Sequence, residues 1–133
     1  MNKKFMVTGF VLLAVLSLGS LLPAQGKAIE FKGILSDVRC WTAGTAGDGT
    51  DMRMNPEKHT VACLKMPDCM KSGYGIVMKD TAGKYEFYKF DAAGSKMAVD
   101  LLNKTTKTDK MMITVMGTKQ KDMIEVESIV ETQ

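Results

Sequence analysis

The chain has 133 residues, of which 45% are hydrophobic and 25% are charged, with 18 basic and 15 acidic side chains. This length predicts one domain with one modest core. The near balance of charge gives no electrostatic reason to expect nucleic acid or an anionic membrane as a partner, and no enzyme motif is recognisable.

The first residues have the pattern of a secretory signal peptide. Two lysines precede an apolar run over residues 5–22, and small residues with a proline then end the run. This order predicts a signal peptide over residues 1–24, cleaved after Ala24 or after Ala28, and therefore a periplasmic or secreted protein. An uncleaved membrane anchor is the alternative, because the run approaches spanning length, but its glycine, serine and proline disfavour it. We expect no membrane span in the mature chain.

The mature part begins with a predicted strand. Between residues 29 and 38 apolar and polar side chains alternate around Gly33, where we expect a bulge or a sharp coil. Residues 42–51 are rich in glycine and threonine and lack an apolar period, which predicts an exposed loop. The Asn-Pro-Glu triplet at residues 55–57 is typical of a helix start, and we expect this helix to continue to about Lys65.

The rest of the chain predicts a short helical turn, two hairpins and one further helix. Pro67 opens the turn and Gly73 ends it. Ser95 is the predicted cap of the helix that lies between the two hairpins. The predicted strands are residues 74–79, 84–90, 111–117 and 123–130, with turns at residues 80–83 and 119–122.

These elements predict a mainly β fold with one or two short helices, in a single domain over residues 29–131. Five strands, with a helix between the third and the fourth and a coiled first strand, match an OB-like five-stranded barrel. Residues 40–73 would then form a helix-bearing insertion after the first strand. The alternative is another small open β-sheet with one helix packed on it.

All three cysteines and the single histidine of the chain fall within this insertion. On the predicted helix, His59 and Cys63 are four residues apart and share one face. Cys69 follows Pro67 and can turn back toward that face, and Cys40 lies at the end of the first strand. The four side chains can therefore converge on one point.

Three interpretations of this cluster are open. As a metal site, Cys40, His59, Cys63 and Cys69 supply three thiolates and one imidazole, a set that suits structural zinc or, with methionines nearby, Cu(I). As a structural feature, a disulfide between Cys40 and either Cys63 or Cys69 would staple the insertion to the barrel and add about 2–4 kcal/mol. As a reactive site, a thiol beside His59 would form a thiolate. The nearby methionines are Met52, Met54, Met66 and Met70.

Two segments, one in the first strand and one in the insertion, resemble a known pattern. GILSD at residues 33–37 precedes Cys40, and HTVAC at residues 59–63 precedes Cys69. Together they resemble a group of small exported bacterial proteins with the pattern G-x-[IL]-x-D-x-x-C, then H-T-x-x-C and a further cysteine. The closing segment, residues 115–129, is similar to the last hairpin of that group. The resemblance implies export and an OB-like β core, and it implies no substrate. The chain departs from the pattern in residues 41–55 and 66–68.

We therefore expect an exported, non-enzymatic binding module that presents a Cys/His site, with zinc, copper or no cofactor. The alternative is a disulfide-stapled domain that binds an envelope or protein partner, and a thiol-based redox protein is a third hypothesis. We interpret the aromatic side chains in the middle of the chain as core or half-exposed sheet packing rather than a base-stacking platform. These residues are Tyr74, Tyr85, Phe87, Tyr88 and Phe90.

Overall fold

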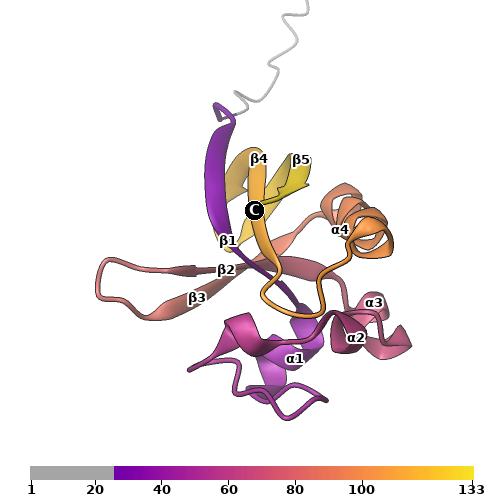
Figure 1. Cartoon of the computed structure of the whole chain (residues 1–133). Coiled ribbons are helices and arrows are strands. Elements are labelled where there is room, and N and C mark those ends of the chain that lie inside the picture. The colour runs from indigo at the N-terminus through magenta and orange to yellow at the C-terminus, as the bar shows by residue number, and fades with distance from the viewer. Residues whose placement is uncertain (1–25) are drawn as a thin grey trace, which may run out of the picture.

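The computed structural model describes residues 26–133, so the predicted signal peptide lies outside the described residues. The described part contains five strands, as predicted, and several short helices, and the mainly β fold class is confirmed (Figure 1). The strands are β1 Ile29–Asp37, β2 Tyr74–Lys79, β3 Tyr85–Phe90, β4 Met112–Gln120 and β5 Met123–Glu131. The helices are α1 Val38–Ala43, the 3-10 helix η1 Pro56–Lys58, α2 Val61–Leu64, α3 Pro67–Ser72 and α4 Ala92–Lys104.

The five strands pair in the order β1-β2-β3-β5-β4, and β4 pairs again with β1, so the sheet closes on itself. All pairings are antiparallel except the one between β3 and β5. That parallel pairing is short, and its register matches Lys89 with Met123 and Phe90 with Ile124. The β4–β5 hairpin is longer and carries a register shift between Met116 and Gly117.

The sequence predicted a bulge or a sharp coil at Gly33, but the pairing of β1 shows no register shift there, and Gly33 lies inside the continuous strand. It pairs with Ile113 of β4, and the next residue, Ile34, pairs with both β4 and β2. At this crossing the neighbouring backbone comes very close, because a Cβ atom on Gly33 would lie 2.3 Å from the carbonyl oxygen of Val77. Only glycine leaves room for β2 to approach β1 at this point.

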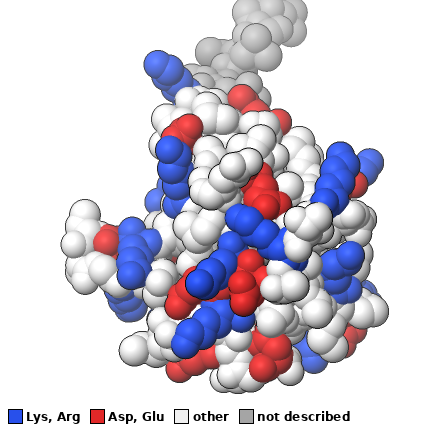
Figure 2. Space-filling view, viewed as in Figure 1, with Lys and Arg blue, Asp and Glu red and all other residues white. Residues whose placement is uncertain are grey.

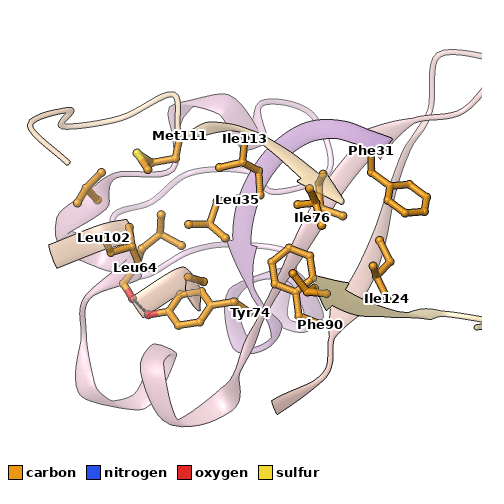
Figure 3. Close-up of a cluster of buried hydrophobic side chains, with 14 residues drawn as sticks. Phe31, Leu35, Leu64, Tyr74, Ile76, Phe90, Leu102, Met111, Ile113 and Ile124 are labelled. Atoms are coloured by element: carbon orange, nitrogen blue, oxygen red, sulfur yellow. Dashed lines mark hydrogen bonds between the residues drawn. The ribbon is translucent and has the colours of Figure 1, made fainter. Parts of the chain in front are cut away.

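The main core lies between the sheet and α4 and extends to the insertion (Figure 3). Its side chains come from all five strands, from α4 and from α2. The hydroxyl of Tyr74 donates a 2.6 Å hydrogen bond to the carbonyl oxygen of Leu64, which attaches α2 to the start of β2. The largest fully buried apolar residues include Leu35, Leu64, Tyr74, Ile76, Phe90, Met111, Ile113 and Ile124.

The cap of α4 differs from the prediction. Asp91, rather than Ser95, is the residue before the helix, and its carboxylate accepts a 3.0 Å hydrogen bond from the amide of Gly94. The hydroxyl of Ser95 instead accepts a hydrogen bond from the amide of Tyr74. Asp91 can cap the helix because aspartate is a good N-cap residue, and the side chain of Ser95 is engaged with β2.

The insertion is more structured than the sequence predicted. Residues 38–43 form α1 instead of ending a strand and starting a loop, and the predicted helix over residues 55–65 is broken into η1 and α2. The break falls at His59 and Thr60, whose backbones are extended. The three α-helices of the insertion gather at one end of the sheet (Figure 1), where a second buried cluster forms from Cys40, Ala46, Met52, Cys63 and Cys69.

On the face shown in Figure 2, basic and acidic side chains are intermixed rather than separated into fields of one sign. Within residues 26–133, no helix combines the length and the apolar character needed to cross a membrane.

Candidate metal centre

Three short helices bring the three cysteines together. Each helix starts with a feature that fixes its first turn: the Asp37 side chain accepts a hydrogen bond from the Cys40 amide, the Thr60 side chain accepts one from the Cys63 amide, and Pro67 opens α3. Aspartate, threonine and first-turn proline are common helix starters. These starts place the thiols of three separate helices in one buried cluster in which each residue is at most 4% exposed.

The sulfur atoms are spaced like ligands around one ion. The Sγ atom of Cys40 lies 3.7 Å from that of Cys69 and 4.0 Å from that of Cys63, and all three lie within 4.8 Å of one another. Two thiolates that bind zinc at about 2.3 Å in a tetrahedron are about 3.8 Å apart. A disulfide bond, by contrast, joins sulfur atoms at about 2.0 Å, and the three cysteines here are free.

His59 lies beside this cluster, but its local backbone structure differs from the predicted helix. It does not share a helix with Cys63, because its backbone is extended at the end of η1. Its imidazole is 1% exposed, and its ring nitrogens come within 4.8 Å of Cys40 Sγ and, separately, of Cys63 Sγ. In the described part of the chain no single ring nitrogen lies that close to two of the sulfur atoms, so the imidazole lies beside Cys40 and Cys63 and not among all three thiols.

Asp37 is the site residue that the sequence analysis missed. It is fully buried at the end of β1, and its Oδ2 atom lies 3.6 Å from Nε2 of His59. Neither that oxygen nor either ring nitrogen of His59 has a hydrogen-bond partner within the described part of the chain. The sequence signal for this residue was its position in the GILSD segment, three residues before Cys40, but no role was predicted for it. Buried polar atoms without partners are costly, which points to a ligand at this position.

The surroundings keep the imidazole of His59 neutral and the thiols of Cys40 and Cys69 protonated. Burial lowers the pKa of His59, although the negative charges of Asp37 and Asp48 oppose this shift. Burial, together with the charge of Asp37, raises the pKa of Cys69 to about 11, and burial also raises the pKa of Cys40. A nucleophilic cysteine needs a lowered pKa, so these directions disfavour Cys40 and Cys69 as the nucleophile of a thiol enzyme. A metal ion would displace the thiol protons when it binds.

Asp48 holds the strand-like segment that carries His59. Its Oδ2 atom accepts hydrogen bonds of 2.8 Å from both the amide and the hydroxyl of Thr60, and its Oδ1 atom accepts one from the amide of Thr50. These bonds break the predicted helix, because they fix Thr60 in an extended conformation as the cap of α2. The carboxylate is thereby engaged in positioning the backbone, and this leaves the imidazole and the thiols as the metal ligands.

The pH dependence of stability should report on Asp48. Partial burial acts to raise its pKa, but the hydrogen bonds from Thr60 and Thr50 outweigh this effect and lower the pKa to about 2. A lowered pKa stabilises the fold above the ordinary value of about 4, and that contribution is lost as the pH falls toward 2. We expect Asp48→Asn to lower the melting temperature at pH 6 and to have a smaller effect at pH 3, measured by calorimetry. Asp100→Asn on α4 is the charge-matched control, and an equal loss at both pH values would contradict the role of Asp48.

A small pocket of about 200 Å³ leads from the surface to the cluster. Cys40 and Cys69 form part of its wall, and Met66, whose side chain is 46% exposed, lies at its rim. A Cβ atom on Gly47 would lie 3.5 Å from the sulfur atom of Cys63 and 3.7 Å from that of Met66, so both sulfur atoms border this glycine. Of the other nearby methionines, Met52 is buried, whereas Met54 and Met70 are exposed.

Comparisons with known proteins identify no relative of this chain. A scan against protein-family models gives no match, and neither the curated proteins nor the solved structures contain a chain that is significantly similar.

Proposed function

We propose that the protein is a non-enzymatic binding module that holds one soft transition metal ion, Cu(I) or Zn(II), in its Cys/His cluster. The observation that carries this proposal is the spacing of the three sulfur atoms, because the distances of 3.7 and 4.0 Å match the edges of a tetrahedral thiolate site. Cys40, Cys63 and Cys69 would be the thiolate ligands. Soft thiolates select Zn and Cu(I) over harder ions.

His59 would be the fourth ligand, with Asp37 as its orienting partner. The single imidazole is fully buried beside the thiols, and one of its nitrogens faces the Asp37 carboxylate while the other is free to bind. Metal-binding histidines commonly donate their second ring proton to a carboxylate, which fixes the orientation of the ring. The low pKa of His59 supports the neutral form, which is the form that ligates.

Of these two ions, Cu(I) is favoured by the exposed methionines near the cluster. Met66 is placed where an arriving ion would meet a thioether before it reaches the thiols. Thioethers are soft ligands that suit Cu(I) and are poor ligands for Zn(II). A binding module of this kind would take up copper through the 200 Å³ pocket and hold it among the three thiolates.

The finer fold assignment and the location of the protein belong to the same proposal. The strand order, the helix α4 between the third and fourth strands and the insertion after β1 support an OB-like barrel. The signal-peptide pattern supports a periplasmic or secreted location. In that setting an oxidising environment competes with the metal for the thiols, so a buried cluster with a narrow pocket is an advantage.

Native mass spectrometry of the reduced protein, titrated without oxygen with Cu(I) and separately with Zn(II), tests the proposal. We expect one ion per chain, and we expect the bound ion to protect all three cysteines from alkylation. A protein isolated from its native compartment that is two protons lighter than the reduced chain and carries no metal would contradict the proposal. That result would support the disulfide-stapled domain, in which Cys40 pairs with Cys63 or Cys69.

A further inference from the structure

A second pocket lies on the β3 side of the molecule, and none of the four Cys/His residues lines it, although its residue Trp41 also packs against the cysteine cluster. It is open to solvent, has a volume of about 500 Å³ and is of the size that small-molecule ligands occupy. Three segments build it: the insertion after β1, the strand β3 and the turn between β4 and β5. Its walls are formed by an aromatic set, Trp41, Tyr85, Phe87 and Tyr88, and by a charged set, Arg53, Lys84, Glu86, Lys119, Lys121 and Asp122.

The aromatic walls are held in a fixed stack. The rings of Trp41 and Phe87 are nearly parallel, with an interplanar angle of 20° and centroids 5.6 Å apart. The guanidinium group of Arg53 lies 3.9 Å from the centroid of the Trp41 ring, so the indole contacts both a charged group and a phenyl ring. Stacking of this kind orients a guanidinium group in advance and leaves its edge free for hydrogen bonds. Of the aromatic residues predicted to be core or half-exposed sheet packing, Tyr74 and Phe90 are buried in the core, whereas Tyr85, Phe87 and Tyr88 are half-buried and line this open pocket.

The positive charges of the pocket have no acidic partners. Within residues 26–133, none of the four basic side chains of this pocket lies within 4.0 Å of a carboxylate, because the ion pairs of the described part involve other residues. Lys119 instead lies 4.0 Å from the ring centroid of Tyr88. Of the two acidic residues, Glu86 accepts a hydrogen bond from the Tyr88 hydroxyl. The pocket therefore has an excess of unpaired positive charge on an aromatic surface.

We infer that this pocket binds a small planar aromatic carboxylate. The planar guanidinium of Arg53 matches a carboxylate in a bidentate pair, and Lys119 adds a second positive charge on another wall. Because the ring of Phe87 is already stacked on Trp41 and lies over Gly75, the half-buried rings of Tyr85 and Tyr88 offer the aromatic surface that a ring-bearing ligand needs. The pocket volume fits one such molecule rather than a long polymer, and the inference does not depend on metal binding.

The test is a titration of the protein with 2-naphthoate, followed by two-dimensional NMR. Trp41 is the single tryptophan of the chain, so its indole N–H signal reports directly on this pocket. We expect this signal to shift. We also expect 2-naphthoate to bind about tenfold more tightly than the neutral 2-naphthalenemethanol and the non-aromatic cyclohexanecarboxylate. Only 2-naphthoate has both a carboxylate to pair with the basic side chains and an aromatic ring to pack on the pocket. Arg53→Gln should weaken binding by about tenfold, since a charged hydrogen-bonded pair is lost.

Lys96→Gln, an equal change of charge on α4 outside the pocket, is the control and should leave binding unchanged. Equal affinity for the neutral compound, or an equal loss in the Arg53 and Lys96 variants, would overturn the inference. Tighter binding of a single-stranded oligonucleotide than of 2-naphthoate at 150 mM salt would also overturn it, because the pocket would then serve a nucleic acid.

Discussion

Replacing Cys40 with serine should lower the affinity for Cu(I) and for Zn(II) by on the order of a hundredfold or more. Zinc sites of four protein ligands bind with about 10–16 kcal/mol, so one ligand accounts for roughly 3 kcal/mol of binding free energy. Cys40 should be the most sensitive of the three positions, because its sulfur atom lies 3.7 and 4.0 Å from the other two. Competition with a chelator of known affinity measures the loss for each variant.

Two controls make the experiment on Cys40 specific. Met112→Leu removes a sulfur atom from an exposed position on β4 outside the cluster, and it should leave the metal affinity unchanged. His59→Gln should weaken binding less than Cys40→Ser, since it leaves the three thiolates in place. Circular dichroism of each metal-free variant shows whether the fold persists. If a folded Cys40→Ser protein binds both ions as tightly as the parent, Cys40 is not a ligand and the proposed site is wrong.

Gly33→Ala should destabilise the fold by about 3 kcal/mol, a large share of the roughly 5–15 kcal/mol of a typical domain. The added Cβ atom would lie 2.3 Å from a backbone carbonyl oxygen of β2 and 2.8 Å from the side chain of Ile76. A backbone atom in a paired strand cannot move aside as a flexible side chain can, so β1 and β2 would have to separate. Chemical denaturation measures the change in the free energy of unfolding.

Gly47→Ala is the matched control for Gly33→Ala. There the added Cβ atom would meet two sulfur atoms at ordinary contact distances of 3.5 and 3.7 Å. The stability of this variant should stay within about 0.5 kcal/mol of the parent or rise slightly, because alanine restricts the unfolded chain. Equal stability of the two alanine variants would contradict the close approach of β1 and β2 at Gly33.

The strands were predictable because their signals are local. Alternation of apolar and polar residues marks β1, β4 and β5, and the turn between β2 and β3 is a short polar segment that ends with Gly83 in a left-handed conformation. Gly33 was also predicted to be an irregular position in the first strand. A glycine is needed there because two strands from distant parts of the chain come close together, and this tertiary contact has no local sequence signal.

The site was predictable in composition but not in geometry. The three cysteines and His59 were identified as a cluster, and the structure brings the three sulfur atoms together with the imidazole beside two of them. The helix that was expected to align His59 with Cys63 does not form, because the Asp48 carboxylate binds Thr60 from twelve residues away. Asp37 was missed for a related reason: a strand-end aspartate reveals its role only when the burial of its carboxylate is known.

The pairing of β1 with β4 has a consequence for how the protein reaches its native state. Gly33 pairs with Ile113, so the ring of strands closes only when segments from opposite ends of the domain meet. Topologies with such distant contacts reach the native state slowly, in roughly milliseconds to seconds. All ligands of the proposed site lie between Asp37 and Cys69, so they leave a ribosome or a translocation channel before β4 does. The newly emerged thiols would therefore meet oxidants or metal ions before the sheet can bury them.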